Sequence, residues 1–118
     1  IEQLTNKNPI KVVDDIYNNH LFAGQASDII WKIIGSNKKN EVYNVAGGDC
    51  ISRYELALKV ADVFSLDSSL ISPVKNSFFK SIAPRPKNTC FDTTKMEKEL
   101  RIKSLKITQG LKRMKNEE

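Results

Sequence analysis

The middle of the chain carries the strongest local signal for a helix. Ser52-Arg-Tyr-Glu55 is a capping box, in which the serine oxygen accepts from a backbone amide and the glutamate reaches back to the start. It predicts a helix from Arg53 to Phe64. Gly47-Gly48 before it predicts a tight turn, and residues 41–46 have the alternating pattern of a strand. The fold must therefore accommodate a strand, a turn and a helix in close succession.

The remaining segments continue this alternation of strands and helices. A single helical turn at 76–82 is expected to point Phe78 and Phe79 inward, and residues 18–20 are expected to form a turn with His20 exposed. The alternation predicts an α/β fold, a small mixed lobe of short strands and about four helices. Further strands are predicted at 9–13, 70–74 and 89–91, and further helices at 23–34, from Asp92 or Thr93 to Leu100, and at 107–114.

Length, charge and cysteine content exclude several classes of protein. The 118 residues allow one domain. The lysines and arginines behind the net charge of +5 are scattered and accompany no nucleic-acid-binding motif, so no nucleic-acid partner is expected. No apolar run approaches the roughly 20 residues of a membrane span, and a cytoplasmic protein without membrane contact is expected. Cys50 and Cys90 lack the spacing of a zinc site and predict buried free thiols rather than a disulfide.

The segment Pro84-Arg85-Pro86 supplies the best candidate for a ligand contact. Each proline restricts its own backbone and that of the preceding residue, so Arg85 projects from a stiffened loop. A guanidinium makes paired hydrogen bonds to phosphate or carboxylate, although an ion pair with Asp92 or Glu97 is the structural alternative. Asn88 is a second candidate for a ligand contact. The alternative is that its side chain bonds to its own backbone, as an asparagine in a turn usually does.

Four further polar residues near the start of the chain are candidates for function. Asp14 and Asp15 end a strand, but adjacent strand residues point to opposite faces, so a turn or capping role is favoured over a shared acid–base site. Tyr17 is a candidate for contact with a substrate, against the alternative of a core aromatic with its hydroxyl at the surface. His20 is the only histidine, which excludes a histidine-based metal site within this sequence.

Five stretches in order resemble the C-terminal part of the dTDP-4-dehydrorhamnose reductases, a family of the extended short-chain dehydrogenase/reductase group. A departure is Gly24-Gln25, where the family commonly has a Pro-Thr pair. The matching stretches are Val12-Val-Asp-Asp-Ile-Tyr17, Tyr43-Asn-Val-Ala-Gly47, Ser52-Arg-Tyr-Glu55, Ala83-Pro-Arg-Pro86 with Phe91-Asp-Thr-Thr-Lys95, and Gly110-Leu-Lys-Arg-Met114.

The resemblance implies that residues 1–118 are the substrate-binding lobe of a longer reductase of Rossmann type. In that reading the missing N-terminal dinucleotide-binding domain holds NADPH or NADH, the substrate is a nucleotide sugar reduced at its 4-keto group, and a homodimer is one arrangement of the whole protein. The fragment itself is expected to hold no cofactor and no catalytic residue, because the family's Tyr-x-x-x-Lys and its glycine-rich loop are absent. The alternative is a non-catalytic regulatory subunit of the same fold, as in methionine adenosyltransferase regulation.

Overall fold

Helices and short strands alternate along the chain in a computed structural model that describes residues 1–80 and 83–117. The predicted α/β class is confirmed, with five α-helices and two two-stranded sheets among the described residues. The helices are α1 (Glu2–Thr5), α2 (Ala23–Gly35), α3 (Arg53–Phe64), α4 (Thr94–Leu100) and α5 (Ile107–Glu117). The strands are β1 (Ile10–Val13), β2 (Tyr17–Asn18), β3 (Ile51–Ser52) and β4 (Ile71–Val74), with 3₁₀ turns η1 (Ser68–Leu70) and η2 (Asn76–Phe78).

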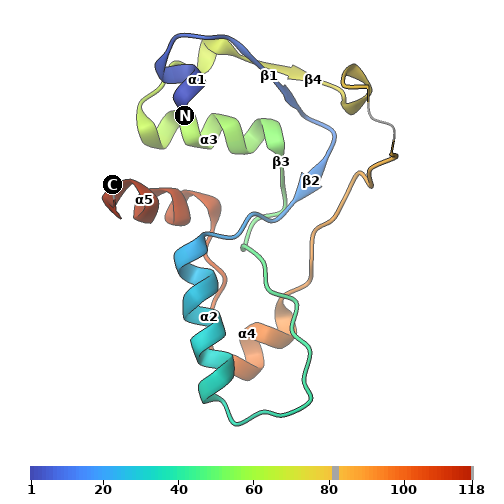
Figure 1. The fold of residues 1–118 in the computed structure, drawn as a ribbon, viewed down its shortest axis with the longest axis vertical. Helices are drawn as coiled ribbons and strands as arrows, with labels where there is room; N and C mark the ends of the chain where they lie inside the picture. Colours follow the sequence, from blue (N-terminus) through green and yellow to red (C-terminus); the bar gives the residue numbers. More distant parts are fainter. Residues whose placement is uncertain (81–82, 118) are drawn as a thin grey trace.

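The first part of the core lies between the β1–β4 pair and α3 (Figure 1). β1 and β4 are parallel, with Ile10 opposite Ile71 and Val13 opposite Val74. Parallel strands need a long crossover, and α3 lies within it. The buried residues of this cluster are Leu4, Ala61 and Ile71, and the apolar face of α3 covers them. The packing therefore holds β1 and α3 against each other.

The second part of the core joins α2 to α4, which lie side by side in Figure 1. Ile29, Met96 and Leu100 are almost fully buried there. Tyr43 and Val45 pack against the same cluster from residues 41–46. The predicted strand at 41–46 is wrong, because this segment pairs with no strand in the described part of the chain. Its alternation instead reflects one-sided packing on a helix pair, which gives the same sequence pattern.

The capping box of α3 is confirmed. Ser52 Oγ accepts a hydrogen bond from Glu55 N (3.1 Å), and Ser52 N donates to Glu55 Oε2 (2.7 Å). The helix spans Arg53–Phe64 as predicted and ends at Ser65 in a left-handed conformation (φ 55°). The turn at Gly47-Gly48 needs a glycine, since a Cβ at Gly47 would collide with the carbonyl oxygen of His20.

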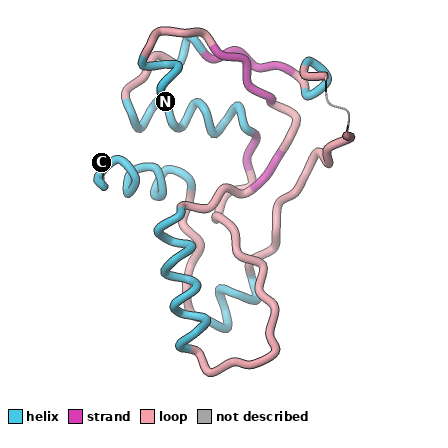
Figure 2. The backbone as a smooth tube through the Cα atoms, in the orientation of Figure 1, coloured by secondary structure: helices cyan, strands magenta, loops and turns pink. Residues whose placement is uncertain are grey.

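Two long loops, residues 36–50 and 83–93, connect the two parts of the core (Figure 2). The predicted strand at 89–91 is wrong: the loop makes only an isolated bridge between Tyr17 and Asn88. The inward orientation of Phe78 and Phe79 is also wrong, because their side chains are about half exposed and stack edge to face with centroids 5.2 Å apart. Ser81 and Ile82, the end of the expected turn, lie outside the described residues.

The start of the chain departs from the prediction at residues 18–20. Asn18 belongs to β2, which pairs antiparallel with β3. His20 is half-buried rather than exposed, and its Nε2 is buried without a hydrogen-bond partner among the described residues. Burial, and secondly the positive charge of Arg53, lower the pKa of His20 below its ordinary value.

No described helix has the length and apolar character needed to cross a membrane.

Candidate functional site

A pocket of about 440 Å³ lies beside β1 and collects positive charge. Four of its lining side chains are cationic, namely Lys11, Arg53, Lys80 and Arg85, and no carboxylate lines it. These residues come from β1, the first turn of α3 and the segment around Pro84-Arg85-Pro86. The other lining residues are Val12, Val13, Ile16, Asn76 and Phe79. An apolar floor with convergent cations suits an anionic ligand that carries an apolar or ring-shaped portion.

Arg85 is exposed and available to a ligand. None of the four ion pairs among the described residues includes it, so the predicted alternative of an ion pair is not found. The two expected carboxylate partners are engaged elsewhere. Asp92 Oδ1 accepts from Thr94 N (2.9 Å) at the start of α4, and Glu97 Oε1 accepts from Ser104 N (3.0 Å). The guanidinium of Arg85 therefore has no ion-pair partner within residues 1–80 and 83–117, and it lies at the edge of the pocket.

Tyr17 and Asn88 are brought together, but through their backbones and outside this pocket. Tyr17 N donates to Lys87 O (2.7 Å), and Thr89 N donates to Tyr17 O (3.0 Å). Asn88 Oδ1 accepts from Cys90 N (2.9 Å), which is the backbone role expected as its alternative. Neither residue lines the pocket of Arg85.

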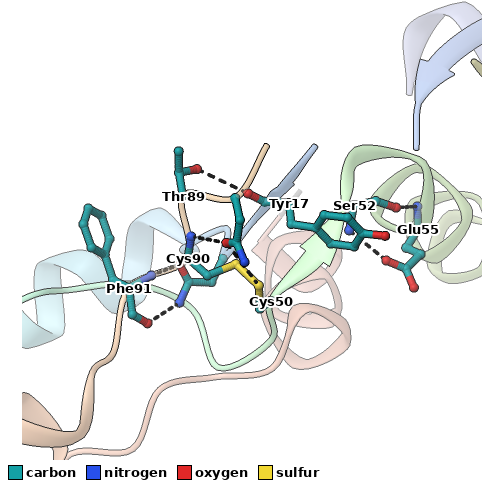
Figure 3. The surroundings of a disulfide bond; sticks show 9 residues. Tyr17, Cys50, Ser52, Glu55, Thr89, Cys90 and Phe91 are labelled. Atoms are coloured by element: carbon teal, nitrogen blue, oxygen red, sulfur yellow. Dashed lines mark hydrogen bonds between the residues drawn. A yellow bond between two sulfur atoms is a disulfide. The ribbon is translucent and has the colours of Figure 1, made fainter. Parts of the chain in front are cut away.

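The side chain of Tyr17 is 40% exposed, so it is not a core aromatic. It lies across from Ser52 in the β2–β3 pair, and Figure 3 shows its ring directed toward Ser52 and Glu55 at the start of α3. Its partner Ser52 is the neighbour of Arg53 in sequence, yet Tyr17 itself does not line the pocket of Arg85. Its role in substrate contact stays a prediction.

Asp14 and Asp15 lie in a bend directly after β1 rather than within the strand, and each has its own partner, which agrees with the favoured turn or capping role. Asp14 forms an ion pair with Lys75 (3.0 Å), and this hydrogen bond raises the pKa of Lys75. Asp15 Oδ1 accepts from Asn76 N (2.8 Å) and holds the start of η2. Both carboxylates therefore fasten the chain just beyond β4, where Asn76 and Phe79 reach the pocket. No group of acidic, histidine or cysteine residues in the described part of the chain forms a metal site.

Lys11, Arg53 and Lys80 were not singled out from the sequence. A weak signal existed for Arg53, because a cation in the first turn of a helix meets the positive end of the helix dipole and is unfavourable without another reason. Lys11 and Lys80 carry no such signal, since only the fold brings them beside Arg85.

The predicted free thiols are wrong, since Cys50 and Cys90 form a disulfide with a Cα–Cα distance of 5.8 Å (Figure 3). Cys50 is exposed and Cys90 is half-buried. The prediction failed because it used only compartment and spacing rules. The closeness of the two cysteines depends on the β2–β3 pair and the Tyr17–Asn88 bridge, which place residues 50 and 90 on either side of β2.

Comparison with known proteins places this arrangement in a family. The family model of the RmlD substrate binding domain matches residues 1–118. A dTDP-4-dehydrorhamnose reductase of Aggregatibacter actinomycetemcomitans is 23% identical over 117 residues, covering 91% of this chain and 40% of the relative. The chain thus spans well under half the length of this curated relative.

Two solved structures have the same fold as this chain. The dTDP-4-dehydrorhamnose reductase of Bacillus anthracis, in complex with NADP, superimposes with a TM-score of 0.89 at 21% identity, covering 99% of this chain and 41% of the other. The reductase of Yersinia enterocolitica gives a TM-score of 0.81 at 23% identity, covering 95% and 39%. At these identities the likeness shows the fold alone. With the family model matching its whole length, the chain belongs to the RmlD substrate binding domain family.

Proposed function

We propose that this chain is the substrate-binding lobe of a reductase acting on the 4-keto group of a nucleotide-linked deoxysugar. The main observation in support is the pocket beside β1, where four cationic side chains converge and no carboxylate is among the lining residues: Lys11, Arg53, Lys80 and Arg85. A nucleotide sugar presents a diphosphate, and a guanidinium can bind it through two parallel hydrogen bonds. The family match and the names of the relatives support this substrate class.

The lobe contributes placement rather than the reacting groups. Tyr17, Tyr43 and Tyr54 are followed four residues later by Leu21, Gly47 and Leu58, so no Tyr-x-x-x-Lys pair is present in the sequence. In the proposal, a Rossmann domain outside this chain binds NADPH or NADH, which supplies the hydride, and carries the proton donor. The cations of the pocket hold the diphosphate and so fix the sugar relative to that domain. Such positioning converts binding energy into rate.

The proposal places the whole protein in the cytoplasm, where nucleotide sugars would be its substrates. A homodimer remains part of the proposal for the whole protein. The proposed reductase activity is tested by measuring turnover of a 4-keto nucleotide sugar with NADPH by the full-length protein. Binding without turnover would favour the regulatory alternative, and no binding at all would reject the proposal.

The pocket itself is tested by calorimetric titration of a nucleoside diphosphate sugar into the full-length protein and its variants. Arg85→Ala should raise Kd roughly 10-fold or more, the range expected for a hydrogen bond between charged groups. Lys87→Ala is the matched control, because Lys87 is exposed on the same loop but does not line the pocket. Equal affinities for the two variants would remove Arg85 from the site.

A further inference from the structure

The Cys50–Cys90 disulfide joins the two chain segments that supply arginines to the cationic pocket. Arg53 follows Cys50 by three residues, and Arg85 precedes Cys90 by five. We propose that this disulfide is a thiol–disulfide exchange site, at which a dithiol reductant releases the loop of Arg85 from the α3 wall and weakens anion binding. The effect on binding rests on the proposed function, whereas the exchange itself does not.

Apart from the disulfide, the restraints found on the loop at 83–92 within the described part of the chain are mainly surface hydrogen bonds. Its residues are exposed apart from the half-buried Cys90, and none of them belongs to either apolar cluster of the described chain. Hydrogen bonds at the chain surface hold the loop: Tyr17 bonds through its backbone to Lys87 and Thr89, Asn19 bonds to Phe91, and Asn44 makes a long bond to Asp92 O. Segments held by exposed hydrogen bonds without apolar packing open at low free-energy cost. The crosslink is therefore the strongest restraint on this loop.

The same restraint fixes the distance between the two pocket walls. Cys50 directly precedes β3, which leads into the capping box that starts α3, so its backbone is tied to the first part of the core. Cys90 is held to Cys50 through the disulfide and to Asn88 Oδ1 through its amide (2.9 Å). With the disulfide broken, Arg85 is tied to the core through a longer and weaker path. Its guanidinium then samples more positions and binds a fixed anion less tightly.

Access of a reductant to the bond favours attack at Cys50, the exposed partner. A thiolate of the dithiol attacks Cys50 Sγ, the S–S bond breaks, and Cys90 leaves as a thiolate that takes a proton from water. The second thiolate of the reductant then attacks the reductant's other sulfur, which is bonded to Cys50 Sγ, and Cys50 leaves as a thiolate that also takes a proton from water. The protein disulfide gains two electrons and two protons, and the dithiol is oxidised to a disulfide.

The chemical setting agrees with a labile bond rather than a structural one. Exposed disulfides are easier to reduce than buried ones and are typically the labile or regulatory ones, and Cys50 is exposed. The two apolar clusters lie elsewhere in the fold, so the packed core does not depend on the crosslink. Reduction should therefore change the loop and leave the fold intact.

The test exposes the full-length protein to increasing dithiothreitol and follows three quantities. Alkylation and mass spectrometry count the free thiols, hydrogen exchange reports on the amides of Thr89 and Phe91, and calorimetry gives the Kd for a nucleoside diphosphate. We expect two new thiols, at least tenfold faster exchange at both amides, and a Kd raised several-fold with unchanged circular dichroism. The Cys50→Ser, Cys90→Ser double variant should match the reduced protein and ignore dithiothreitol.

The outcomes separate this proposal from the proposed function. Unchanged amide exchange after full reduction would overturn the proposal, as would global unfolding, because the disulfide would then be structural. Faster exchange with an unchanged Kd would overturn the coupling to the pocket. Oxidised protein that binds no nucleoside diphosphate, yet still shows the exchange response, would reject the proposed function and retain the exchange site.

Discussion

Asn19 holds Phe91 through both groups of its side-chain amide. Asn19 Nδ2 donates to Phe91 O (3.0 Å), and Phe91 N donates to Asn19 Oδ1 (3.1 Å), across 72 residues of sequence. This pair of bonds fastens the loop that carries Arg85 to the segment after β2 (Figure 3). It is the point where the site depends most directly on a single polar side chain.

Replacing Asn19 should therefore loosen the loop. Asn19→Ala removes two hydrogen bonds, each contributing roughly 0.5–1.5 kcal/mol, so we expect a loss of about 1–3 kcal/mol in the free energy of unfolding. Urea unfolding of the full chain measures it. Asn44→Ala is the control, since Asn44 makes one long bond of 3.5 Å to Asp92 O and should change stability little. Equal losses in the two variants would contradict the assignment.

The capping box gives a second prediction. Ser52→Ala removes the oxygen that accepts from Glu55 N, and loss of such a cap costs about 1 kcal/mol. Because Ser52 is almost fully buried, the freed amide gains little from water. The control is Ser27→Ala, which replaces an exposed serine inside α2. The thermal unfolding midpoint of Ser52→Ala should be lower than that of the Ser27→Ala control. A midpoint at or above that of the control would show that the cap contributes nothing.

The sequence predicted the features that depend on local chemistry. α3 begins and ends where the capping box and apolar spacing placed it, and Arg85 stands exposed as its flanking prolines suggested. The strands at 41–46 and 89–91 were wrong because a strand also needs a partner, which no local pattern supplies. Alternation at Tyr43 and Val45 arises from contact with the α2–α4 cluster instead.

The composition of the site was only partly within reach of the sequence. Lys11, Arg53 and Lys80 join Arg85 because the parallel β1–β4 pair and α3 bring distant segments together. The prediction of free thiols failed for the same reason, since the approach of Cys50 and Cys90 follows from the tertiary structure. Residue type identified the candidate ligand contact, whereas the number and arrangement of its neighbours required the fold.

Two glycines with opposite surroundings give a paired prediction. A Cβ at Gly110 would lie 3.0 Å from Phe22 Cβ, an atom next to the backbone that cannot swing away, whereas a Cβ at Gly35 would meet nothing within 4 Å. Gly110→Ala should therefore be destabilising by roughly 1–3 kcal/mol through overpacking, partly offset by helix propensity. Gly35→Ala should be neutral or stabilising by up to about 1 kcal/mol. Urea unfolding that ranks the two variants in the reverse order would contradict the close packing of α5 on Phe22.

Glu97 should make stability depend on pH in the acid range. The backbone amide of Ser104 is the main cause that lowers the pKa of Glu97, with Thr93 Oγ1 also donating to Oε1 (3.3 Å). A lowered folded-state pKa gives stability that is present above the unfolded pKa of Glu and lost as pH falls through the folded value. Unfolding free energies measured at several pH values should thus fall toward low pH, and Glu97→Gln should flatten the fall. Glu2→Gln controls for the lost charge, and parallel curves for wild type and Glu97→Gln would reject the assignment.

The last prediction separates the geometry of Arg85 from its charge. Arg85→Lys keeps the positive charge but loses the planar fork, so paired hydrogen bonds to a diphosphate cannot form. All four cations of the pocket are exposed, and their summed attraction should be screened as the Debye length shortens to about 10 Å at 0.1 M salt. We therefore expect Arg85→Lys to weaken nucleoside diphosphate binding several-fold at every salt concentration, and Lys80→Ala to weaken it mainly at low salt. Calorimetric titrations over a salt series measure both. Parallel salt responses of the two variants would mean that Arg85 contributes charge alone, and the bidentate contact would have to be abandoned.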